Sequence, residues 1–239
     1  MYIDKILVDA SLSRDGTYIA ELPAVRQLKR DRELAFTSDV TIFVGENGSG
    51  KSTLLEALAI CAGFNAEGGS KNFNFATRPS ESGLHQYFTI LKRDFPKDGY
   101  FLRAESFYNV ATEIENRHVE QTYGGSLHLR SHGESFLDLV TKRFWGNGLY
   151  ILDEPEAALS PSRQLSLLAE FHRLVQEHSQ LIIATHSPIL LAYPGADIRL
   201  FDEEGIRSVR YQETEHYQLT KRFLDCPERM LSILFDENA

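Results

Sequence analysis

The fold of this chain is decided by the segment Thr41-Ile42-Phe43-Val44-Gly45-Glu46-Asn47-Gly48-Ser49-Gly50-Lys51-Ser52-Thr53. Its first four residues are apolar or β-branched, as in a buried strand, and a helical pattern begins at Ser52. Between them, Gly45 to Ser52 match the pattern GxxxxGK[ST], in the strand-to-helix position where such a loop binds phosphate. A glycine-rich turn that precedes a helix by chance is the alternative, and the strand before the loop argues against it.

This pattern indicates a nucleotide-phosphate site that runs from Gly45 to Thr53. Glycines let backbone amides surround an anion, and the helix N-terminus adds a favourable dipole. We expect Lys51 to reach the β- and γ-phosphates and the Ser52 hydroxyl to bind Mg²⁺. The expected ligands are therefore ATP and Mg²⁺.

A second candidate site follows the apolar run Leu149–Leu152, which ends in Asp153-Glu154. The carboxyl ends of parallel strands form the ligand-binding edge of such sheets. We expect Asp153 to hold Mg²⁺ through water and Glu154 to act as the general base on the attacking water. An ordinary exit from a strand is the alternative reading of Asp-Glu-Pro, and the nearby phosphate loop disfavours it.

The 239 residues suit one large α/β domain, and the strands alternate with helical patterns, which predicts a mainly parallel sheet. The expected strands are Ile6–Val8, Thr41–Val44, Tyr100–Leu102, Leu149–Leu152 and Leu181–Ala184. Helices are expected from Leu54, from Phe136 and from Pro161, the last with Ser160 as its cap. Residues 66–79 are expected to form a mobile loop, and a hairpin and a helical C-terminal segment are expected after Gly195.

Composition limits the function classes. Asp and Glu number 34 against 25 Lys and Arg, a formal charge of −9, so the chain as a whole is not a basic nucleic-acid binder. The densest basic cluster, Arg26 to Arg32, is more typical of a solvated face. Only Cys61 and Cys226 occur, without a CxxC pair, which favours a cytoplasmic location. No apolar run approaches the ~18 residues that span a bilayer, and residues 1–10 lack a signal-peptide pattern.

These motifs together resemble the ABC ATPase family. Ser131-His132-Gly133-Glu134-Ser135 is similar to the family signature, and Ala157-Ala158-Leu159-Ser160 to the D-loop, with Ser160 in place of the usual aspartate. His186 resembles the switch histidine. The resemblance implies a catalytic role for Lys51, Glu154 and His186, and contacts from Ser131 and Gly133 to the γ-phosphate bound by a second copy. Glu105 stands where the family has glutamine and is expected to supply an oxygen to Mg²⁺, with Gln86 as the alternative.

The implied fold is a P-loop NTPase with the ABC-ATPase head architecture. Residues 1–239 would form one domain, with a mainly parallel sheet flanked by helices, an antiparallel portion and a small helical subdomain within about residues 66–145. The residues of these motifs are most similar to those of the RecF, OLD and SMC branch of the family. This sequence has no heptads between Ser52 and Ser131, and it contains no nuclease domain.

Three functions are compatible with this resemblance. The first is an ATP-hydrolysing switch or clamp that dimerises on ATP and acts on DNA or a protein partner, in DNA repair or phage defence. The second is the ATP-binding subunit of a transporter, and the third is an ATP sensor with little hydrolysis. No aromatic side chain is assigned to the adenine, since Tyr2, Tyr18 and Phe36 are all candidates and each fits core packing equally well.

Overall fold

A computed structural model gives the fold of the chain and describes residues 1–14, 16–71, 82–105, 107–116 and 132–235. The strands are β1 (Ile3–Val8), β2 (Glu33–Ala35), β3 (Val40–Gly45), β4 (Phe88–Lys92), β5 (Asp98–Arg103), β6 (Gly148–Asp153), β7 (Gln180–Ala184), β8 (Asp197–Asp202) and β9 (Gly205–Val209). The α-helices are α1 (Pro23–Asp31), α2 (Lys51–Ala62), α3 (Phe107–Asn116), α4 (His132–Arg143), α5 (Pro161–Gln176), α6 (Pro188–Leu191), α7 (Glu215–Asp225) and α8 (Pro227–Leu234). Short 3₁₀ helices are η1 (Ala10–Arg14), η2 (Tyr18–Glu21), η3 (Leu84–Tyr87) and η5 (Tyr211–Glu213).

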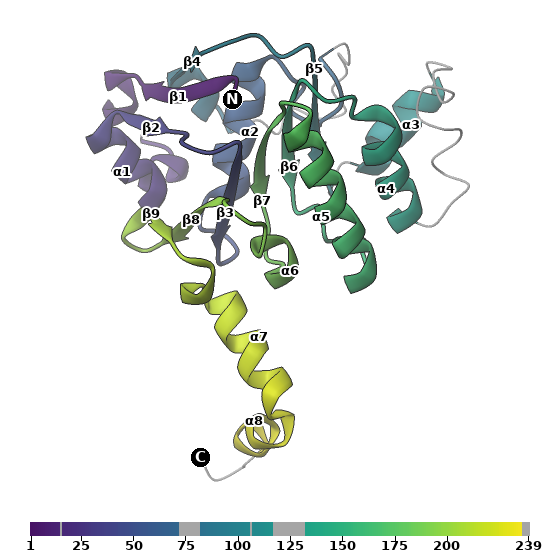
Figure 1. Cartoon of the computed structure of the whole chain (residues 1–239). Helices are drawn as coiled ribbons and strands as arrows, with labels where there is room; N and C mark the ends of the chain where they lie inside the picture. The colour runs from purple at the N-terminus through teal and green to yellow at the C-terminus, as the bar shows by residue number, and fades with distance from the viewer. Residues whose placement is uncertain (15, 72–81, 106, 117–131, 236–239) are drawn as a thin grey trace.

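A six-stranded sheet with the order β5-β6-β7-β3-β8-β9 forms the centre of the molecule (Figure 1). All neighbouring pairs are parallel except β8 and β9, which form the expected antiparallel hairpin. A second sheet, β2-β1-β4, is antiparallel. The α/β class with a mainly parallel sheet, helices and an antiparallel portion is therefore confirmed.

The central strands are buried on both faces because helices or the second sheet cover each face. In β3, Phe43 belongs to the core that contains α2, α1 and the second sheet, whereas Ile42 and Val44 face the core formed with α4 and α5. This alternation follows from the two-residue period of a strand. It explains why the run Thr41 to Val44 has no charged residue and no exposed position.

A buried glutamine joins the two sheets. Gln180, at the start of β7, accepts hydrogen bonds from the backbone amides of Tyr2 and Ile3 at 2.7 and 2.8 Å and donates to the Ile3 carbonyl at 3.1 Å. These three bonds give the buried side-chain amide its hydrogen-bond partners. Without them, burial of this polar group would cost free energy. They fix the first strand against the end of the central sheet.

Two local expectations need correction. Helix α5 does begin at Pro161, but the Ser160 side chain makes no capping hydrogen bond, and its Oγ lies 3.3 Å from Ser162 Oγ. The first part of the expected mobile loop is instead tied to β5, because Gly69 and Phe101 exchange backbone hydrogen bonds of 2.7 and 3.0 Å. Residues 72–79 of that loop lie outside the described residues.

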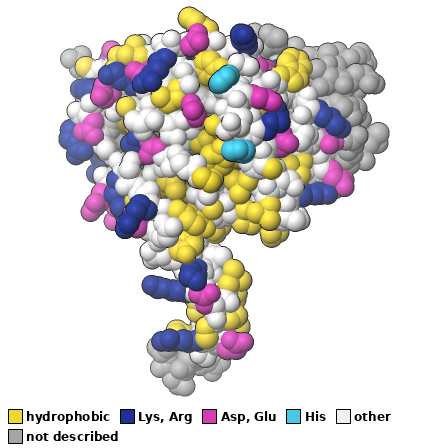
Figure 2. Space-filling view, in the orientation of Figure 1, with side chains coloured by type: hydrophobic (Ala, Val, Ile, Leu, Met, Phe, Trp, Pro, Cys, Tyr) yellow, Lys and Arg dark blue, Asp and Glu magenta, His cyan; other side chains and the backbone are white. Residues whose placement is uncertain are grey.

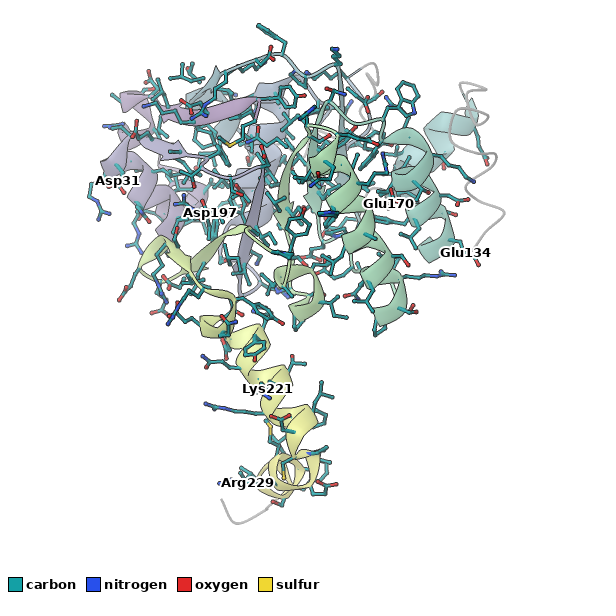
Figure 3. All side chains as sticks on the ribbon, in the orientation of Figure 1. Asp31, Glu134, Glu170, Asp197, Lys221 and Arg229 are labelled. Atoms are coloured by element: carbon teal, nitrogen blue, oxygen red, sulfur yellow. The ribbon has the colours of Figure 1, made fainter. Side chains whose placement is uncertain are left out.

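Helices α7 and α8 form an arm that projects from the body (Figure 1). Hydrophobic side chains lie along it (Figure 2), and Leu219, Phe223, Leu224, Ile233, Leu234 and Phe235 are exposed. Figure 3 places Lys221 on α7 and Arg229 on α8, both away from the body. The arm leaves the body from the side of the sheet that carries the candidate site.

Candidate functional site

The predicted phosphate loop connects β3 to α2, as its sequence indicates. Gly45 has φ 150°, and a side chain there would collide with the backbone carbonyl of Phe201 on β8. Gly50 precedes α2 with φ 97°, in the left-handed region, and a Cβ there would lie 3.2 Å from Leu22 Cδ1. Both positions require glycine, which has no Cβ to clash or to strain the backbone.

Lys51 is buried, with only 4% of its surface exposed. Its Nζ donates to the carbonyls of Gly45 at 2.8 Å and Glu46 at 2.7 Å, so the ammonium group lies inside the loop. Burial lowers the pKa of Lys51, while the charges of Glu154 and Asp153 act in the opposite direction. The cation is thus held where an anion on the loop would meet it.

Ser52 and Asp153 meet although they lie on different elements. The Ser52 Oγ donates to Asp153 Oδ1 at 2.9 Å. Asp153 is 6% exposed, and burial raises its pKa to about 6, against the lowering effects of Arg103 and of the bond from Ser52. A hydroxyl and a carboxylate of this kind are oxygen ligands that suit Mg²⁺.

Arg103 is a basic residue that the sequence reasoning missed. It ends β5 directly beside Asp153 in the sheet register. Its Nη1 donates to Glu56 Oε2 of α2 at 2.7 Å, and its Nε lies 3.7 Å from Asp153 Oδ2. Sequence alone offers no signal for this cluster, because three separate elements bring the groups together.

Glu154 and His186 form the second half of the site. Glu154 has φ 51°, which is rare for a residue with a side chain, and its amide donates to the Ala184 carbonyl at 2.9 Å. The Glu154 Oε1 lies 3.6 Å from His186 Nε2, and that nitrogen is buried with no hydrogen-bond partner among the described residues. The His186 amide donates to Glu156 Oε1 at 2.6 Å. Burial and then Lys51 lower the pKa of His186, although Glu154 opposes this.

The structure adds His216 to this group. It lies at the start of α7, and its Nε2 is 3.0 Å from His186 Nδ1. No motif of the sequence includes His216, and only the structure places it in the site. It lines a recess together with Glu46, Asn47 and His186, a juxtaposition that no sequence spacing indicates.

The expected signature lies partly outside the described residues, since Ser131 is not among them. Helix α4 begins at His132, so the segment does open a helix. A Cβ on Gly133 would lie 2.6 Å from the Ala158 carbonyl and 2.7 Å from Arg163 Nη1, so Gly133 packs against the predicted D-loop. Glu134, labelled on α4 in Figure 3, pairs with Arg163 at 3.1 Å.

The remaining candidates lie around the site rather than in it. Glu105 has 85% of its side chain exposed, and its Oε2 lies 3.6 Å from Arg103, which in turn contacts Asp153. Gln86 is exposed in η3. Of the three aromatic candidates for adenine stacking, Tyr2 and Phe36 are core residues and Tyr18 is exposed in η2.

A larger recess lies between the phosphate loop, the β8–β9 hairpin and the start of α7. It has a volume of about 560 Å³ and is lined by Pro23, Gly45, Glu46, Asn47, Gly48, Ser49, Leu200, Phe201, Asp202, Glu203, Arg207, Glu213, Glu215 and His216. No described helix is long and apolar enough to cross a membrane.

Comparisons with known proteins place the chain in a family. A family model described as "AAA domain" matches residues 21–144, just over half of the chain, and one described as "AAA domain, putative AbiEii toxin, Type IV TA system" matches residues 129–192. A DNA replication and repair protein RecF from Gloeobacter violaceus is 29% identical over 168 residues, 68% of this chain and 43% of that protein. A ribose import ATP-binding protein RbsA from Bacillus cereus is 26% identical over 183 residues, 66% of this chain and 36% of that protein.

Each of these matches spans less than half of the relative's own length. Among solved structures, the SMC head domain from Thermotoga maritima is 18% identical with a TM-score of 0.43, over 88% of this chain and 99% of that one. A putative metal-chelate type ABC transporter is 16% identical with a TM-score of 0.48, over 91% and 88%. With its phosphate loop and the model that covers just over half of its residues, the chain belongs to the AAA-domain family of P-loop ATPases, and RecF and the ABC ATPases are its homologues.

Proposed function

We propose that this chain hydrolyses ATP with Mg²⁺ and that two copies close around the nucleotide to form a switch or clamp. The observation that carries the proposal is the meeting of three groups at one edge of the sheet. These are the buried Lys51 in the phosphate loop, the Ser52–Asp153 pair and the Glu154–His186 pair. They supply a phosphate cation, two metal ligands and a candidate base with a neighbouring imidazole.

The residues fit a magnesium ion. Ser52 Oγ and Asp153 Oδ1 lie 2.9 Å apart, so one cation can take both oxygens as ligands, directly or through water. The described residues hold no cluster of three or more His, Cys, Asp or Glu side chains that could cage a metal. The remaining ligands would come from phosphate and water, as is usual for this ion. Bound Mg²⁺ would neutralise charge on the β- and γ-phosphates.

In the proposed reaction, water attacks the γ-phosphorus, the bond to the β-γ bridging oxygen breaks, and ADP and phosphate leave. Glu154 orients the water and accepts its proton, as its position beside His186 suits. The unpartnered Nε2 of His186 would bind the transferring group. Lys51 would leave its loop carbonyls for the phosphate oxygens, which offer stronger charge-assisted bonds.

The second copy is part of the same proposal. By resemblance to ABC ATPases, Ser131 and Gly133 of one copy would contact the γ-phosphate bound by the other. Gly133 packs on the turn after β6 of its own chain, so by the same resemblance the signature and the D-loop would lie together at the dimer interface. Loss of phosphate would remove the bridge and open the dimer.

For the biological role, we propose action on DNA or on a protein partner, in repair or in phage defence. The match to RecF over 68% of the chain supports this choice. A transporter subunit is the second candidate, supported by the match to RbsA. An ATP sensor with little hydrolysis is the third, and the turnover rate decides that question.

The test uses Glu154→Gln, with Lys51→Ala and the remote exposed Glu33→Gln as comparisons. Loss of a general base should slow hydrolysis by about 100-fold or more while ATP still binds. Mass in solution, with and without Mg-ATP, should show an ATP-dependent dimer for Glu154→Gln, and Lys51→Ala should lose nucleotide affinity. Short duplex DNA in a parallel sample separates the DNA-acting role from the others. Wild-type turnover by a monomeric Glu154→Gln protein would refute the assignment.

A further inference from the structure

Hydrogen bonds to two different side chains hold the segment that carries His186 in place. Its amide donates to Glu156 Oε1 at 2.6 Å, and the next residue, Ser187, donates from its hydroxyl to Gln164 Oε1 of α5 at 2.5 Å. Ser187 also accepts hydrogen bonds from two amides of α6, which begins directly after it. These contacts fix the backbone of His186, but they leave the rotation and the proton position of its ring undetermined.

The C-terminal part of the chain supplies the contacts that act on the ring. The Tyr211 hydroxyl donates to the Pro188 carbonyl at 2.9 Å, and the centres of the Tyr211 and Tyr217 rings lie 4.6 Å apart. These contacts join α7 to the segment that carries His186. His216 then meets His186, with Nε2 and Nδ1 separated by 3.0 Å and the ring centres by 5.2 Å. The start of α7 is thereby fixed against the catalytic side chain.

A contact between two imidazole nitrogens has a chemical consequence. Each neutral ring carries one N–H, so one nitrogen must donate and the other must accept. Burial is the largest cause that lowers the pKa of both rings, and the charge of Lys51 adds to it, against Glu154 for His186 and against Glu215 and Glu46 for His216. Both rings are therefore neutral near neutral pH.

We propose that His216 is a positioning residue that donates from Nε2 to His186 Nδ1 and so keeps the His186 proton on Nε2. That atom is buried, has no hydrogen-bond partner among the described residues and lies 3.6 Å from Glu154 Oε1. An N–H at this place points to the region where Glu154 and the γ-phosphate would meet. With the other tautomer, a lone pair would face the two anionic groups and repel them.

This proposal rests on the proposed ATP hydrolysis and adds a way in which the rate of hydrolysis could be controlled. His216 is the second residue of α7, so the tautomer and orientation of His186 depend on where the α7–α8 arm starts. A contact that moved the arm would therefore change the His186 ring through His216. The arm would thus be linked to turnover.

The experiment compares the full chain with His216→Ala and His216→Gln, and it uses His172→Ala, an exposed histidine of α5, as the matched control. Loss of the donor should reduce kcat about fivefold, the effect of one ordinary hydrogen bond, and leave KM for ATP within about twofold. Gln can place an N–H near the position of Nε2, so His216→Gln should restore most of kcat. The control should match the wild type.

A spectroscopic readout makes the test independent of turnover. Ring ¹⁵N shifts of His186, in the nucleotide-free protein, should report the Nε2–H tautomer in the wild type and a mixture in His216→Ala. Equal kcat and equal ring shifts in His216→Ala and the wild type would overturn the proposal while leaving ATP hydrolysis intact. A wild type that binds Mg-ATP without hydrolysing it would refute the proposed function and, with it, the role of His216 in turnover.

Discussion

Replacement of Asp98 by Asn should destabilise the protein strongly without impairing the site. Asp98 begins β5, at the end of the sheet opposite the candidate site, and only 9% of its side chain is exposed. It accepts from Arg143 Nη1 at 2.8 Å, from the Tyr150 hydroxyl at 2.7 Å and from the Trp145 amide at 3.2 Å. Asn keeps the size and one acceptor but removes the charge.

The magnitude follows from what the substitution removes. The Arg143 side chain is 10% exposed, so Asp98→Asn removes the anion of a buried ion pair, and breaking such a pair costs about 3 to 5 kcal/mol. The oxygen that Asn retains favours the lower end, about 3 kcal/mol. The free energy of unfolding of a whole domain is only about 5 to 15 kcal/mol, so this loss is large.

The pH dependence gives a second check. Burial raises the pKa of Asp98, but the bonds from Arg143 and Tyr150 and the charge of Arg143 outweigh it, so the pKa lies below its ordinary value. Because the pKa is lower in the folded state, the charged Asp98 stabilises the folded protein. This contribution to the free energy of unfolding is complete above the unfolded-state pKa of about 3.9, and it is lost as the pH falls through the folded-state pKa. The difference in the free energy of unfolding between wild type and Asp98→Asn should therefore stay constant from about pH 7 to about pH 5. This gap should narrow only below about pH 4.

Urea unfolding followed by circular dichroism measures this gap. Asp225→Asn is the control, because it breaks an exposed Lys221–Asp225 pair of 2.7 Å on the arm, where water screens the charges, and it should leave the midpoint unchanged. ATP turnover per folded molecule should be the same in all three proteins. A midpoint for Asp98→Asn equal to that of the control, or a gap that closes between pH 7 and pH 5, would refute the reasoning.

Three further predictions concern the site itself. Gly45→Ala should abolish ATP binding measured by calorimetry, because its Cβ would collide with a backbone carbonyl of β8, whereas Gly48→Ala, with no atom within 4 Å of its Cβ, should retain weak binding despite φ 81°. Ser52→Ala should raise the Mg²⁺ concentration for half-maximal hydrolysis about tenfold or more, since it removes one oxygen ligand beside Asp153, and EDTA should stop the wild-type reaction. Gly133→Ala should weaken the ATP-dependent dimer, seen as a lower mass in solution, because its Cβ would lie 2.6 Å from a carbonyl of the turn after β6; an unchanged dimer would argue against this interface.

Much of the fold could be predicted because its signals are local. The run Thr41 to Val44 is apolar or β-branched at every position, and both faces of β3 are buried. Glycines at 45 and 50 have positive φ angles, as the glycines of the loop pattern allow. The apolar run before Asp153 likewise forms β6 and ends at the predicted carboxylate.

Other features could not be predicted because they depend on pairs that are distant along the chain. Gln180 reaches Tyr2, Arg103 reaches both Glu56 and Asp153, and His216 reaches His186. None of these residues forms a motif with its partner. The sequence interpretation therefore assigned no role to His216 or to Arg103.

By itself, the sequence determined the strand–loop–helix that can bind phosphate, the acidic end of β6 and the α/β class. These depend on backbone angles and on the two-residue period of burial, which neighbouring residues encode. Tertiary structure alone decided which side chains surround those groups, that burial raises the pKa of Asp153, and that α7 begins against His186. Charge, desolvation and hydrogen bonding act through space, so they are fixed only once the sheet has brought distant strands to one edge.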